Sequence, residues 1–167
     1  MSTDQPLAGP VPSAVAPVTA FLERSGVAYK LVAHRETWSA RAEARALNYP
    51  AEQVAKTLVL RDGDGAYRLA VVPGSHRLDL DKVRELFDAS NGLRLATEDE
   101  MRADLPDFAP GTVPPFGDLV SAPGVVDHRL LDFNRVVCPA GDHTHSVLFD
   151  AEALVRAGAR VADVCAD

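Results

Sequence analysis

The feature that most constrains the fold is a pair of apolar, β-branched segments joined by a short turn. The segments TLVLRD and AYRLAVV flank Asp62-Gly63-Asp64-Gly65. Aspartate and glycine favour tight turns, and alternating β-branched and apolar residues favour strands, so residues Thr57 to Val72 are predicted to form a β-hairpin. Because a hairpin requires antiparallel pairing, the pattern favours an α+β domain over a doubly wound parallel sheet.

Short helices and strands are predicted on both sides of this hairpin. Each helix is expected to begin at a residue that favours a helix N-terminus: Pro17, Ser39, Asp79, Thr97 and Asp150. Asn91-Gly92 is expected to end the third helix. Apolar patterning predicts strands over residues 27–32, 135–138, 145–149 and 160–165. The segment 106–124 holds too many prolines and glycines for regular structure and is expected to be a long loop.

Composition and charge narrow the class of protein. Residues 1–16 are rich in proline, alanine and serine and are predicted to be a disordered tail, which leaves residues 17–167 as one domain. No apolar segment is long enough to span a bilayer, and the first residues lack the features of a secretory signal, so a cytoplasmic protein without a membrane partner is expected. A formal net charge of −7 argues against a protein that coats the backbone of DNA or another nucleic acid, and it limits any contact with nucleic acid to a small surface.

Two segments near the hairpin could carry chemistry. Lys56 lies at the start of the first hairpin strand, among residues expected to be buried. Its ammonium either reaches the surface along its aliphatic stem or points into a pocket, where it would hold a phosphate or a developing oxyanion. The loop Gly111–Gly117 could present backbone amides to a ligand and place Phe116 as an apolar wall, or it could be a rigid connector.

A third candidate is the polar segment between Cys138 and His145, which has a strand–turn–strand pattern. Cys138, His143 and His145 are residue types that bind zinc, but their spacing is not that of a zinc finger, and no metal site is predicted. The remaining histidines are expected on the surface or in loops: His34, His76 and His128. The sequence has no nucleophile elbow, P-loop or dinucleotide-binding motif.

The order of these segments resembles that of the YbaK/proline-tRNA-synthetase-associated domain family. The resemblance rests on VAKTLVLRDGDGAYRLAVVPGSHRLDLDKV, PGTVPPFGD and VVCPAGDHTHSVLF, and it runs from about His34 to Val164. It implies an α+β fold with a curved mixed, largely antiparallel sheet and surrounding helices. It also implies an enzyme that deacylates mischarged aminoacyl-tRNA in trans, with no cofactor, and with the aminoacyl-tRNA acceptor end as its partner. Docking on an aminoacyl-tRNA synthetase is left open.

The resemblance assigns residues to the site as well. Lys56 and His143 are implied to be catalytic, with His143 acting chemically or only positioning the substrate. The residues implied to bind substrate are Gly111, Pro115, Phe116, Gly117, Gly141 and Asp142. Backbone amides of the loop would stabilise the oxyanion, so that no side-chain nucleophile is required.

Substrate identity is the least constrained part of this prediction. Synthetases discriminate poorly among small side chains, so the expected substrate is proline tRNA carrying a small wrong amino acid such as alanine or cysteine. The chain departs from the family pattern at Trp38, Asp118 and Pro139, which bears on selectivity more than on reaction class. Two alternatives stay open. One is a non-catalytic module of the same fold that binds an aminoacyl-tRNA end or a protein, and the other is a zinc hydrolase.

Overall fold

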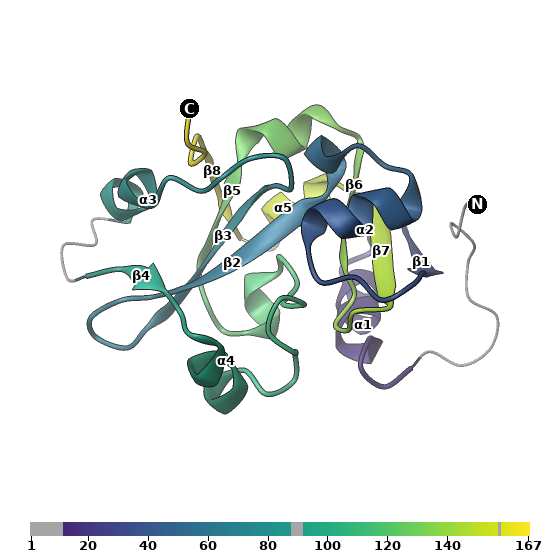
Figure 1. Ribbon diagram of the computed structural model, residues 1–167, viewed down its shortest axis with the longest axis horizontal. Helices are drawn as coiled ribbons and strands as arrows, with labels where there is room; N and C mark the ends of the chain where they lie inside the picture. The colour runs from purple at the N-terminus through teal and green to yellow at the C-terminus, as the bar shows by residue number, and fades with distance from the viewer. Residues whose placement is uncertain (1–11, 88–91, 157) are drawn as a thin grey trace.

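The computed structural model describes residues 12–87, 92–156 and 158–167, which fold around two β-sheets (Figure 1). The smaller sheet is antiparallel and contains, in order, β1 (Tyr29–Ala33), β7 (His145–Asp150) and β6 (Arg135–Pro139). The larger sheet contains, in order, β4 (Arg94–Leu95), β2 (Ala55–Arg61), β3 (Tyr67–Pro73), β5 (Gly124–Asp127) and β8 (Arg160–Ala162). In the larger sheet β4, β2 and β3 pair antiparallel, whereas β3, β5 and β8 pair parallel.

Short helices flank both sheets. The α-helices are α1 (Ala16–Arg24), α2 (Ala40–Leu47), α3 (Leu80–Leu86), α4 (Glu98–Asp104) and α5 (Glu152–Arg156). The 3-10 helices are η1 (Ala51–Gln53), η2 (Gly117–Leu119) and η3 (His128–Asp132). In Figure 1, α1 and α2 lie on the side of the smaller sheet, and α3 and α4 lie near β4. Among the helices of the described residues, none has the length and apolar character needed to cross a membrane.

The predicted hairpin is confirmed, because β2 and β3 pair antiparallel over their full length. Asp62 stabilises its turn, since its Oδ1 accepts hydrogen bonds from the backbone N–H groups of Asp64 at 2.9 Å and Ala66 at 3.0 Å. The α+β class and the mixed, largely antiparallel pairing are also confirmed. The strands form two sheets rather than one, however, and a parallel bridge between Val54 and Val137 joins them. Strand β5 was not predicted, because it directly follows the proline-rich segment.

Three of the predicted helix N-termini are confirmed by their capping hydrogen bonds. Ser39 caps α2 and Asp79 caps α3, each through a side-chain oxygen that accepts a backbone N–H of the first turn. Thr97 and Glu100 form a reciprocal capping box at the start of α4. The predicted helix end at Asn91 lies outside the described residues.

The end of the predicted tail, residues 12–16, is part of the described structure. Residues 1–11 lie outside the described part of the chain. Val15, which the prediction placed in the tail, is fully buried, and its N–H donates to the Pro12 carbonyl at 3.1 Å. Val15 belongs to the largest hydrophobic cluster, together with Phe21 and Leu22 of α1. The packed domain therefore begins before the predicted boundary at residue 17.

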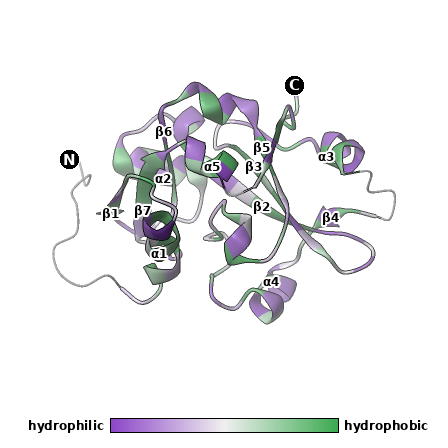
Figure 2. Ribbon diagram, turned by 180° about the vertical axis from the view of Figure 1, so that it is seen from behind, coloured by the Kyte–Doolittle hydropathy of each residue, from purple (hydrophilic) through white to green (hydrophobic). Residues whose placement is uncertain are grey.

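The largest core cluster joins α1, the proline-rich loop and the smaller sheet. Phe116 stacks on Phe21 with ring centroids 4.7 Å apart and meets Phe149 edge-on at 5.2 Å. Apolar residues are concentrated on the central strands, whereas α4 is largely hydrophilic (Figure 2). This aromatic cluster anchors the proline-rich loop to the core.

Candidate functional site

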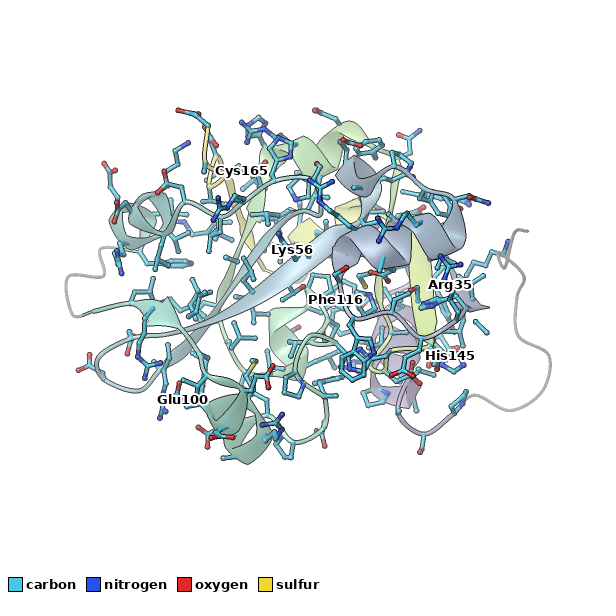
Figure 3. The ribbon with its side chains drawn as sticks, in the orientation of Figure 1. Arg35, Lys56, Glu100, Phe116, His145 and Cys165 are labelled. Carbon is cyan, nitrogen blue, oxygen red and sulfur yellow. The ribbon has the colours of Figure 1, made fainter. Side chains whose placement is uncertain are left out.

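A cavity of about 270 Å³ opens where the two sheets meet. Its walls come from four segments: residues 34–43, which include the start of α2; residues 55–58 of β2; residues 111–113 of the proline-rich loop; and residues 139–145 around the β6–β7 turn. In Figure 3, Lys56 on β2 lies near the middle of the molecule and His145 lies at the start of β7, on the side of the smaller sheet. Tertiary packing thus gathers side chains that are more than 100 positions apart in the sequence.

The structure brings half of the predicted site residues to this cavity. Those that line it are Lys56, Gly111, Asp142 and His143. Those that lie outside its lining are Pro115, Phe116, Gly117 and Gly141. The prediction of Phe116 as a pocket wall is corrected, because its ring is fully buried between two other phenylalanines of the core. Pro115 is also buried.

Backbone packing explains why glycine occupies two of the predicted positions outside the cavity lining, Gly117 and Gly141. A Cβ atom on Gly117 would lie 2.1 Å from the carbonyl oxygen of Ala122, and one on Gly141 would lie 2.4 Å from that of Ala14. Gly141 also has a φ of 114°, which favours glycine. The Thr112 hydroxyl lies 3.1 Å from the Gly141 carbonyl oxygen and joins the loop to the turn. Close backbone packing therefore accounts for glycine at both positions without a contact to the cavity.

Lys56 occupies one wall of the cavity. Its Nζ donates a hydrogen bond to the His76 carbonyl oxygen at 2.9 Å. An ammonium has three donors, so two N–H groups remain for a ligand. Burial lowers the pKa of Lys56, and the nearby positive charges of Arg41 and Arg77 lower it further. These three cations form a local positive region on a chain whose net charge is −7.

His143, another lining residue, is held in one orientation. Its Nδ1 lies 3.0 Å from the Thr37 carbonyl oxygen, and the Thr37 N–H donates to the His143 carbonyl at 2.9 Å. Because a carbonyl oxygen only accepts, Nδ1 must carry the proton, which leaves Nε2 of the neutral ring as an acceptor. The Trp38 ring stacks on the imidazole with centroids 3.8 Å apart and is 71% exposed. The pair forms an aromatic surface that lines the cavity and faces solvent.

Asp142 organises the turn that carries His143. Its Oδ1 accepts the Thr144 N–H at 3.0 Å, and its Oδ2 lies 2.9 Å from Nδ1 of His145. Both Asp142 and His145 line the cavity. The carboxylate thus fixes the turn and orients a second imidazole at the same time.

A buried hydrogen-bond network behind this wall was missed by sequence reasoning. Ser146 Oγ contacts Glu43 Oε2 by a hydrogen bond and lies 2.8 Å from His34 Nε2. His34 Nδ1 donates to the Arg35 carbonyl at 2.6 Å. His34 lies in the loop between β1 and α2, as expected, but it is not a surface residue, because it is 9% exposed and lines the cavity. The sequence did contain a sign that Glu43 is buried, since helical spacing places it on the same face of α2 as the apolar Leu47.

The protonation states of the network follow from its burial. Burial raises the pKa of Glu43 to about 7, although the Ser146 hydrogen bond opposes that rise, and burial lowers the pKa of His34. The Ser146 hydroxyl donates to Glu43 Oε2, and His34 Nδ1 donates to the Arg35 carbonyl. The arrangement is not a nucleophilic triad, because Ser146 is fully buried and lies outside the cavity lining.

This assignment predicts a pH-dependent stability difference between the wild type and Glu43→Gln. A carboxyl group whose folded pKa is raised from 4.5 to about 7 favours folding most below pH 4.5, and that contribution is lost as the pH rises through 7. Relative to the variant, the wild type should lose up to about 3 kcal/mol of unfolding free energy between pH 4.5 and pH 8. Urea unfolding across this pH range measures the difference. A difference that is constant with pH would contradict the raised pKa.

The zinc alternative requires three donors to converge: Cys138, His143 and His145. Within the described residues these atoms do not form a group whose members lie within 4.8 Å of one another. Cys138 is fully buried, and burial raises the pKa of its thiol, which opposes the thiolate that zinc requires. Donor atoms do converge at Asp127, His128 and Asp163, but Arg129 already forms ion pairs with both carboxylates at 3.0 and 3.1 Å.

The fold and cavity define an α+β protein with a polar site at the junction of two sheets. The chain belongs to the aminoacyl-tRNA editing domain family, whose sequence profile matches residues 34–157. This match confirms the resemblance to the YbaK family. It makes aminoacyl-tRNA editing the functional class of the chain.

Solved structures agree with this assignment. A structure described as a "putative trans-editing enzyme for prolyl tRNA synthetase" is 30% identical to the chain, with a TM-score of 0.81, over 95% of this chain and 100% of that one. A structure described as hypothetical protein APE2540 is 28% identical, with a TM-score of 0.80, over 90% of this chain and 99% of that one. None of the curated proteins compared with the chain matches it significantly.

Proposed function

We propose that the protein is a trans-editing aminoacyl-tRNA deacylase that hydrolyses the ester bond between a wrong amino acid and the terminal ribose of its tRNA. The observation that carries the proposal is the convergence of Lys56, His143 and the Gly111 segment on one cavity. An aminoacyl ester is activated enough that hydrolysis needs mainly a positioned water and stabilisation of the tetrahedral oxyanion. The cavity offers groups suited to both tasks.

The positive region around Lys56 suits the 3′ end of tRNA. Arg41 and Arg77 add positive charge near the Lys56 ammonium, which has two N–H groups to spare, so a phosphate or a developing oxyanion would be held by charge-assisted hydrogen bonds. The exposed Trp38 ring, which also lines the cavity, offers a surface on which a base can stack. In this arrangement the nucleotide lies at the mouth and the ester lies deeper.

In the proposed reaction, His143 is the residue that activates the attacking water. Nε2 of a neutral His143 can accept a hydrogen bond from the attacking water or from a ribose hydroxyl, which positions the substrate even without full proton transfer. Backbone amides of the Gly111 segment are the proposed oxyanion donors. The Thr112 N–H is already bonded to the Ala109 carbonyl at 2.9 Å, so a donor must come from a neighbouring amide.

The proposed substrate is proline tRNA that carries a small wrong amino acid such as alanine or cysteine. The description of the similar structure names prolyl tRNA synthetase, and a cavity of about 270 Å³ suits a small aminoacyl group. Synthetases cannot reject such analogues by binding alone, because one methylene group is worth only about 1–3 kcal/mol.

A panel of aminoacyl-tRNAs tests the proposed function. We expect many turnovers per protein on alanyl- or cysteinyl-tRNA specific for proline and far slower hydrolysis of correctly charged prolyl-tRNA. Release of the labelled amino acid measures the rate. Saturable binding without turnover on every member would instead establish the non-catalytic module, and full activity only in protein that contains one zinc per chain would establish the zinc hydrolase.

A further inference from the structure

Glu43 carries a buried carboxylate oxygen without a partner. The side chain projects from α2, is 2% exposed and lines the cavity. Its Oε2 is bonded to Ser146, whereas its Oε1 has no hydrogen-bond partner among the residues that the structure describes. An unsatisfied buried carboxylate oxygen is costly, so its retention at a cavity wall points to a ligand that supplies the missing donor.

A second polar atom in the same state lies on another wall. Thr57 follows Lys56 on β2 and lines the cavity, and its Oγ1 is also buried without a hydrogen-bond partner in the described part of the chain. Both atoms accept hydrogen bonds. A cation with several N–H groups is therefore the ligand whose chemistry fits them together.

Among the residues that the structure describes, no lysine or arginine is bonded to Glu43 Oε1. The one lysine on the cavity wall, Lys56, donates to the His76 carbonyl. The influences on the pKa of Glu43 are burial and the Ser146 hydrogen bond. A carboxyl group held in this way is stabilised as a carboxylate when a cation arrives, so ligand binding and proton release are linked.

We propose that Glu43, assisted by Thr57, binds the α-ammonium group of the aminoacyl ester and thereby positions its carbonyl carbon for attack. This inference rests on the proposed deacylase function. Glu43 is a positioning residue, since the reacting atoms are the ester carbon and water. The Ser146–His34 chain holds the carboxyl group so that Oε1 keeps its place at the cavity wall.

The proposal also explains how the site would reject proline, the correct amino acid of the proposed tRNA. A primary ammonium, as in alanine or cysteine, has three N–H donors, whereas the secondary ammonium of proline has two and carries a ring carbon in the third position. A primary ammonium can rotate to direct two of its N–H groups at two separate acceptors, whereas the ring of proline fixes both N–H directions, so such a site favours primary amines. Loss of one charge-assisted bond should weaken binding by roughly 10- to 150-fold.

The test compares alanyl-tRNA with lactyl-tRNA, in which a hydroxyl group replaces the α-ammonium. The wild type should prefer alanyl-tRNA by roughly 10-fold or more in kcat/KM. Glu43→Gln should lose most of this preference, through a higher KM for alanyl-tRNA and little change for lactyl-tRNA. Glu52→Gln, an exposed glutamate on η1 outside the cavity lining, is the matched control and should keep the wild-type ratio.

Three results would overturn the proposal, and they are distinguishable. Equal wild-type activity on both esters would mean that the amine is not recognised, and this measurement needs no variant to fold. An equal loss on both esters in Glu43→Gln would assign the residue a purely structural role. Hydrolysis of neither ester, nor of any panel member, by the wild type would remove the deacylase function itself.

Discussion

Replacing Lys56 with alanine should reduce kcat/KM for deacylation by about 100- to 1000-fold while leaving the fold intact. The side chain is only partly buried, and its ammonium makes a single hydrogen bond, to the His76 carbonyl. Its removal deletes the charge that the proposed function places against the phosphate or the oxyanion. Single-turnover deacylation of alanyl-tRNA, together with circular dichroism, measures both outcomes.

Two further variants make this prediction specific. Lys56→Arg keeps the charge with a different donor geometry and should retain part of the activity. Lys82→Ala removes a lysine that is bonded to the Cys165 carbonyl and paired with Asp163 outside the cavity, so its rate should match that of the wild type. An unchanged rate of Lys56→Ala on every mischarged tRNA would exclude Lys56 from the mechanism.

Replacing Phe116 with alanine should cost about 3–5 kcal/mol of unfolding free energy, because it leaves a cavity among Phe21 and Phe149 in the largest core cluster. Urea unfolding followed by circular dichroism measures the loss. The family resemblance implied a substrate-binding role for this ring, whereas its burial makes it part of the core. Stability, rather than substrate affinity, is therefore the quantity that should change.

Phe116→Leu separates these two roles. Leucine keeps much of the apolar volume, so it should cost less than alanine. The folded fraction of either variant should hydrolyse mischarged tRNA with a KM close to that of the wild type. Wild-type stability combined with a raised KM would show instead that Phe116 contacts the substrate.

The elements that the sequence predicts well depend on near neighbours along the chain. The β2–β3 hairpin follows from alternation and from Asp62 in the turn, and the start of α4 follows from Thr97 and Glu100. Capping and turn bonds join residues two to four positions apart, so they can be inferred from local spacing. The same reasoning placed Val15 in a tail, because the local composition around it shows nothing of the core against which it packs.

The site depended on packing that local patterns do not reveal. Glu43 and Ser146 are separated by 103 positions, and His34 and Ser146 by 112. The family order raised Lys56 and His143 from candidates to site residues, whereas Phe116, which the same resemblance assigned to the site, belongs to the core. Which side chains face the cavity depends on how β2 meets the smaller sheet.

By itself, the sequence determined the α+β class, the hairpin, the capped helices and the family, because periodicity, turn chemistry and segment order are properties of the chain alone. The tertiary structure decided that the strands form two sheets, that Phe116 is core, and that Glu43 presents an unpartnered oxygen to the cavity. The physical reason is that burial and hydrogen-bond satisfaction are set by contacts between distant segments. Neither quantity exists until those segments pack.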